Sequence, residues 1–594
     1  MRAITRASAL MLAAALALAG WDYWRKSPPA AANSALAPTP DHAVASPYAR
    51  PPAATWLVAP DAYGDDLPPL GTSLFDQRVA ALGGAAALPY PFEQLLERVE
   101  GDARCADLPD GRCLVRVLIP IGRSLQRLAA APDFFHHPRI VAAMAGEPDS
   151  DGPLQRDRLY LGHVGNSDII EVISYNEAAA RFEFQLVLDY RAGGSPRVVY
   201  ARRALCLSCH QNHAPIFSRP LWQETNANPA VAARLLARQP SFDGVPVQRG
   251  IDLPTAIDTA TARATRFALW QTLWQIGCGD GEHGVRCRAA LFEAALHYRA
   301  TGRHDYAATR REAIRSAFAA AWQARWPGGL ALPDPNIPSR DPLPDDAAQA
   351  GGVLLANIPA PFEPLAPRAP LEIWRQADDA RINDTVAGLA DFLGARDLAR
   401  LDAAFAGRVA EPADFARVSR AIAALAAADG GPFAAVPFRR DRLMPALLAQ
   451  LGQAPASASS TLAVAPPVRD APQFPPAPSA GLFQRYCTPC HQTPASSPPN
   501  FLHGDDATVR ARLTHCAARI RYRLAMWQLP PDARPKTPMP PQQALRALGA
   551  DPERWPASAE LATLRAYAAE LAGGGVLPRP DNYEALAPCL PAPS

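Results

Sequence analysis

The chain has 594 residues, of which 48% are hydrophobic and 64 are proline, and its net charge is +2 at pH 7. This length predicts about three to four domains, and the apolar content excludes a mostly disordered chain. The near-neutral charge argues against a nucleic-acid partner, because nucleic-acid binders draw much of their affinity from concentrated positive charge.

The N-terminus has the features of an export signal. Arg2 and Arg6 precede an uncharged apolar run, Ala7 to Gly20, which is shorter than a membrane span of ~20 residues. Ala17-Leu18-Ala19 fits the small-x-small pattern of a signal-peptidase site. Residues 1–26 are therefore expected to be a cleaved signal peptide or, alternatively, an N-terminal anchor in the inner membrane, with the remainder of the chain in the periplasm.

A Pro- and Ala-rich lead-in, 27–69, is followed by a first globular region, 70–327. Segments with alternating, β-branched or aromatic residues predict consecutive antiparallel strands: Asp168–Tyr175, Arg181–Tyr190 and Arg197–Tyr200. Helical patterns follow: Ala264–Ile276 and Arg288–Tyr298. We therefore expect an α+β domain that contains an antiparallel strand element.

Two Pro-rich segments divide the rest of the chain. Residues 328–370 and 454–478 read as linkers, and the Ala/Leu-rich residues 371–453 between them predict a helical region. A last domain covers residues 479–594. The whole chain is expected to be a multidomain, mainly α protein.

Two motifs with the same C-x-x-C-H pattern are the strongest functional signal in the sequence: Cys206-Leu207-Ser208-Cys209-His210 and Cys487-Thr488-Pro489-Cys490-His491. C-x-x-C-H is the attachment signature of c-type haem, and chance placement of the chain's 10 Cys and 12 His predicts roughly 0.003 such motifs. Two thiols three positions apart can each form a thioether with the porphyrin, and the adjacent histidine can bind the iron. A zinc site would require clustered pairs of cysteines, and a thioredoxin-like pair needs no histidine. We expect two covalent haem c groups, with His210 and His491 as iron ligands.

The last domain resembles class I cytochrome c. Phe483 lies one helical turn before Cys487, beside Gly481 and Leu482, as on the first helix of that family, and an apolar helical pattern near the C-terminus matches its last helix: Leu561, Leu564, Tyr567 and Leu571. Pro538-Met539-Pro540-Pro541 is similar to the family's methionine loop. The resemblance implies a class I cytochrome c fold in which Met539 is the sixth iron ligand, with Met526 as the rival.

The first motif has no such methionine loop after it. His213 follows His210 by only three residues and is expected on the same side of the porphyrin as His210. Unless the sixth position of this iron is open, four upstream residues are candidates for it: His136, His137, Met144 and His163.

The six cysteines outside the motifs are expected to pair as disulfides, because an exported protein lies in an oxidising compartment. Six cysteines allow fifteen connectivities. Proximity along the chain and shared domains favour three pairs: Cys105–Cys113, Cys278–Cys287 and Cys516–Cys589.

These features predict a periplasmic dihaem c-type cytochrome that passes electrons to redox partner proteins, with no dedicated catalytic residues. An alternative is an enzyme of the dihaem peroxidase or oxygenase kind, in which the first haem keeps an open sixth position. A haem-based sensor is a third reading, for which the sequence gives weaker support.

Overall fold

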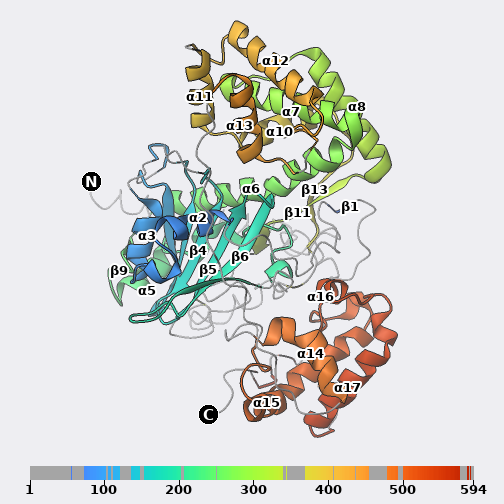
Figure 1. Cartoon of the computed structure of the whole chain (residues 1–594). Helices are drawn as coiled ribbons and strands as arrows, with labels where there is room; N and C mark the ends of the chain where they lie inside the picture. The colour runs from blue at the N-terminus through green and yellow to red at the C-terminus, as the bar shows by residue number, and fades with distance from the viewer. Residues whose placement is uncertain are drawn as a thin grey trace, which may run out of the picture.

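The structure is a computed structural model (Figure 1). It describes residues 55–56, 72–101, 105–108, 111–120, 135–147, 153–201, 206–248, 250–338, 343, 365, 368–405, 407–434, 437–453, 478–492, 499–574, 583, 585–587 and 589. The expected signal or anchor, 1–26, therefore lies outside the described residues, as does most of the lead-in. The described chain is a multidomain, mixed α/β protein with more strand than the mainly α expectation allowed.

A six-stranded antiparallel sheet organises the first half of the chain. Its order follows the sequence, so that each strand pairs with the next: β2 (Leu114–Ile119), β3 (Arg139–Met144), β4 (Leu159–Val164), β5 (Ile170–Asn176), β6 (Arg181–Leu188) and β7 (Arg197–Tyr200). The last three strands confirm the expected antiparallel element. The first three were not predicted, because segments such as Leu114–Ile119 are buried at every position and lack the alternation of a half-exposed strand.

Helices cover the two faces of this sheet. One face packs against α2 (Leu74–Ala81), α3 (Phe92–Glu100) and α5 (Pro229–Leu236), with Met144, Leu161 and Val187 among the strand residues in that core. The other face packs against α6 (Asp252–Thr272), a 21-residue helix that continues into a π-helical turn, η5 (Leu273–Gly277). Helix α6 contacts β2 and β3, and its Phe267 packs against Tyr175 of β5 and Phe182 of β6.

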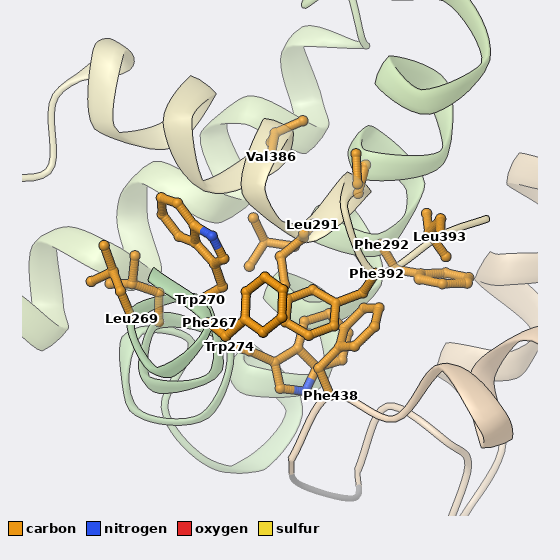
Figure 2. Packing of buried hydrophobic residues seen from close by; sticks show 14 of the residues in the cluster. Phe267, Leu269, Trp270, Trp274, Leu291, Phe292, Val386, Phe392, Leu393 and Phe438 are labelled. Atoms are coloured by element: carbon orange, nitrogen blue, oxygen red, sulfur yellow. The ribbon is translucent and has the colours of Figure 1, made fainter. Parts of the chain in front are cut away.

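The expected helical region shares a core with the first domain. Helices α7 (Gly281–Thr301) and α8 (Ala308–Arg325) pack with four later helices: α10 (Asp379–Ala390), α11 (Ala395–Phe405), α12 (Pro412–Ala427) and α13 (Arg440–Gln450). Figure 2 shows Trp270 and Phe267 of α6 in one apolar cluster with Val386 of α10 and with Phe392 and Phe438. Residues more than 100 positions apart thus form one continuous core.

Short strands occupy part of the segment expected to be a linker. Strand β11 (Leu330–Pro333) pairs with β1 (Thr55–Trp56) and with β13 (Pro370–Trp374). Strand β12 (Asn336–Pro338) pairs in parallel with β8 (Phe217–Arg219), which follows the first C-x-x-C-H motif. The pairing of β12 places Ile337 in one small apolar cluster with Cys209 of that motif. A small hairpin, β9 (Ser241–Phe242) and β10 (Val245–Pro246), completes this half of the chain.

The last domain is helical and has its own core, and it forms the orange-to-red lobe of Figure 1. Its helices are α14 (Pro478–His491), α15 (Asp506–Ala525), α16 (Gln542–Ala547) and α17 (Ala559–Leu571). Helix α17 packs on both α14 and α15, and the rings of Phe483 and Tyr567 meet edge to face, 5.4 Å apart.

All three expected disulfides are confirmed: Cys105–Cys113, Cys278–Cys287 and Cys516–Cys589. The last one joins α15 to the C-terminal tail across 73 residues of sequence. Among the helices of the described residues, none combines the length and apolar character that a membrane crossing requires.

Candidate haem attachment sites

The first C-x-x-C-H motif forms a single helical turn. The backbone N–H groups of Cys209 and His210 both donate to the carbonyl oxygen of Cys206, at 3.2 and 2.9 Å. Both thiols therefore lie on one turn, next to the histidine, as attachment to a single flat ring requires. Leu207 is buried beneath the turn against Phe184 of β6, in a small cluster that also includes Cys206.

His210 is held in one tautomer. Its Nδ1 lies 2.8 Å from the carbonyl oxygen of Ala214, and because a carbonyl only accepts, Nδ1 carries the proton and Nε2 keeps its lone pair. The ring also lies 5.1 Å from the ring of Phe184. His210 is only partly exposed, and its imidazole is closely surrounded by protein. This burial disfavours the charged form and lowers the pKa of His210 to about 4, so the imidazole is neutral at pH 7.

Arg368, from a distant part of the chain, hydrogen-bonds to the same turn. Its guanidinium donates to the carbonyl oxygens of Cys209, at 2.8 Å, and of Asp334, at 3.0 Å, while its backbone N–H donates to the side chain of Gln211. After burial, the charge of Arg368 is the next cause that lowers the pKa of His210. Nothing in the sequence pattern predicted this contact, because 157 or more positions separate Arg368 from the motif.

The structure places the residues that the sequence offers as a sixth iron ligand for the first motif in different parts of the fold. His163 on β4 and Met144 on β3 lie on the face of the sheet that packs against α2 and α3, where His163 meets the rings of Phe92 and Tyr190. Phe184, which contacts His210, lies on the other face. The structure thus does not bring His163 or Met144 together with His210.

The remaining candidate histidines and His213 occupy different positions. His136 and His137 are exposed in the turn that leads into β3. His213 has a positive φ of 56°, and its backbone N–H donates to the carbonyl oxygen of His210 at 2.8 Å, so it belongs to the motif's own turn.

The second motif repeats the arrangement of the first at the end of α14. His491 Nδ1 lies 2.7 Å from the carbonyl oxygen of Pro499, and burial lowers the pKa of His491 to about 4. The imidazole stacks on Phe501, with ring centres 4.3 Å apart. Burial is the main cause that raises the pKa of the Cys487 thiol, and the charge of Cys490 raises it further.

Arg523 of α15 links the methionine loop to this site. The backbone N–H of Met539 donates to the carbonyl oxygen of Arg523 at 3.1 Å, and the Arg523 guanidinium donates to Thr537. The charge of Arg523 also lowers the pKa of His491. Met539 is half-buried between buried prolines, whereas Met526 is 3% exposed.

The four cysteines of the two motifs take no part in the three disulfides. Among the described residues, no group of three or more His, Cys, Asp or Glu side chains forms a metal-binding cluster of its own. Comparisons of the chain with protein-family models, with curated proteins and with solved structures returned no match.

Proposed function

We propose that this protein is a periplasmic dihaem c-type cytochrome that transfers electrons between redox partner proteins. Cys206 and Cys209 would hold the first haem and Cys487 and Cys490 the second, with His210 and His491 as iron ligands. When bound, each haem supplies a one-electron couple between ferric and ferrous iron.

One observation carries the proposal: both motif histidines have Nδ1 tied to a backbone carbonyl oxygen four and eight residues downstream. This second-shell contact fixes the ring and presents the Nε2 lone pair to a metal, as in most protein sites where histidine binds a metal ion. The same contact occurs in two lobes with unrelated surroundings, which argues that the contact belongs to the motif and not to local packing. The donor set thus fits the haem that the sequence implies.

For the C-terminal domain we propose a class I cytochrome c fold. The support is the packing of α14 on α17 through Phe483 and Tyr567, together with a methionine loop anchored on α15. With Met539 as sixth ligand, the second iron would have no open position. A soft thioether ligand also raises the reduction potential, because it favours ferrous iron.

The proposed compartment rests on the three disulfides, which form and persist in oxidising environments. In that compartment the electron donor and acceptor would be other periplasmic redox proteins. Either form of the N-terminal segment, cleaved signal or inner-membrane anchor, would deliver the chain there.

A second candidate function is a reaction of peroxide or oxygen at the first haem. The placement of His163 and Met144 on the far side of the sheet favours it, since two of the four candidate sixth ligands then lie away from His210. An open sixth position would admit a small ligand, whereas a relay requires only that the iron cycle between its two oxidation states.

Carbon monoxide separates the two functions. The relay predicts a ferrous spectrum that does not change when carbon monoxide is added, with low-spin ferric bands for both haems. Carbon monoxide binding by half of the haem, or high-spin ferric bands of that amplitude, would contradict the pure relay and support the reaction at the first haem.

A further inference from the structure

One face of the sheet is incompletely buried beside the first motif. The side chains of β5 and β6 that face α2, α3 and α5 are mostly buried. On the opposite face of these two strands, several side chains are only half-buried. We call these residues the open sheet face: Val164, Glu171, Ile173, Leu186, Leu188 and Val199. They are neighbours in space, because Glu171 is in register with Leu186, and Leu186 with Val199.

The open sheet face adjoins the first attachment motif. Phe184 lies between Leu186 and Phe182 on the same side of β6, and it packs with Ile173, Leu207 and Cys206. The imidazole of His210 contacts Phe184 as well. A ring joined to Cys206 and ligated by His210 would therefore meet the apolar side chains of this face first.

An ion pair lies within this otherwise apolar face. Arg139 Nη2 of β3 is 2.6 Å from Glu171 Oε2 of β5, and their side chains are 17% and 29% exposed. The guanidinium reaches across β4 at Gly162, where a Cβ atom would lie 2.7 Å from Arg139 Nη2. The absence of a side chain at Gly162 thus makes room for a cation on the open sheet face.

Porphyrin chemistry matches this combination. The haem ring offers a broad apolar surface, and its two propionates are carboxylates that arginine binds through its planar fork of donors. Glu171 and Ile173 lie on the same face of β5, and Ile173 packs with Phe184, whose ring contacts that of His210, so the pair lies along the face that meets the first motif.

We propose that the first haem packs against the open sheet face and that Arg139 binds one of the haem propionates. The Arg139–Glu171 pair then sets the reduction potential of this haem. This inference rests on the proposed function, because it requires haem on Cys206 and Cys209. Positive charge near an iron favours the ferrous form and negative charge favours the ferric form, so the two members of the pair act in opposite directions.

The test is a mediated spectroelectrochemical titration of the full-length dihaem protein and two single variants. Arg139→Gln should shift the midpoint potential of the first haem to lower values, and Glu171→Gln should shift it to higher values. The midpoint potential of the second haem should stay the same in both variants. A general loss of folding cannot produce shifts of opposite sign, so the pair of variants separates tuning from damage.

Arg181→Gln is the matched control. Arg181 is 24% exposed and pairs with Glu183 on the opposite face of the same sheet. Removal of the Arg181 charge should therefore leave the midpoint potentials of both haems unchanged. Unchanged first-haem potentials in both Arg139→Gln and Glu171→Gln, or shifts of the same sign, would overturn the inference. A wild-type protein without haem on Cys206 and Cys209 would instead contradict the proposed function itself.

Discussion

At the scale of single residues, the structure distinguishes two methionines that the sequence offers as ligands of the second iron. Met526 is buried in the core of the lobe at the end of α15. Met539 is half-buried in a loop whose prolines restrict its backbone, and that loop hydrogen-bonds to Arg523. A half-buried thioether on an ordered loop is available to a metal without unfolding a helix.

Met539→Ala is therefore expected to remove the weak near-infrared band of sulfur-to-iron charge transfer and to lower the potential of the second haem, with covalent haem content unchanged. The physical reason is loss of a soft ligand that favours ferrous iron. Near-infrared absorption of the ferric protein measures it.

Met526→Ala is the control for that experiment. Truncation of a buried methionine costs about 2–5 kcal/mol of stability, but the band should survive it. A band that persists in Met539→Ala and disappears in Met526→Ala would reverse the ligand assignment.

At the scale of elements, the contact of α10 with α6 joins the expected helical region to the first domain. Gly388 of α10 lies against the indole of Trp270, and a Cβ atom at this position would overlap the ring. The helices thus approach closely because this position has no side chain. Trp270 also packs near Trp374 of β13, with ring centres 6.0 Å apart.

Gly388→Ala should consequently destabilise the shared core by about 1–3 kcal/mol, the usual cost of overpacking. Thermal or denaturant unfolding followed by tryptophan fluorescence measures the change. Gly481→Ala is the matched helical control, since a Cβ atom there meets nothing within 4 Å, and the higher helix propensity of alanine should stabilise by up to ~1 kcal/mol. Equal effects of the two substitutions would show that the contact with Trp270 does not constrain α10.

Local sequence patterns predict some elements well and others not at all. The β5–β7 strands were predictable because their alternation reports one buried and one half-exposed face. The strands β2–β4 were missed, since burial of both faces removes that alternation. The strand β11 lies inside a Pro-rich stretch, and its two partners lie about 275 and 40 residues away along the chain, so local composition pointed to a linker.

At the scale of the whole molecule, the described chain has three large hydrophobic cores. One core joins a face of the sheet to α6–α8 and α10–α13, a second lies between the other face and α2, α3 and α5, and a third belongs to the C-terminal lobe. The first C-x-x-C-H motif packs in a small cluster with Phe184 of the sheet and the second ends α14 of the C-terminal lobe, so the proposed haems would lie in different structural surroundings. The attachment residues were readable from the sequence because the chemistry requires fixed spacing along one turn. Arg139, Glu171 and Arg368 were not, because strand register and long-range packing place them near His210.

The number of covalent haems on the exported protein tests the central claim most directly. Intact mass together with the pyridine haemochrome spectrum should give two haems per chain, one haem in Cys206→Ala/Cys209→Ala, and one in Cys487→Ala/Cys490→Ala. Protein exported in a host that matures c-type cytochromes, yet carrying no haem on either motif, would contradict the account.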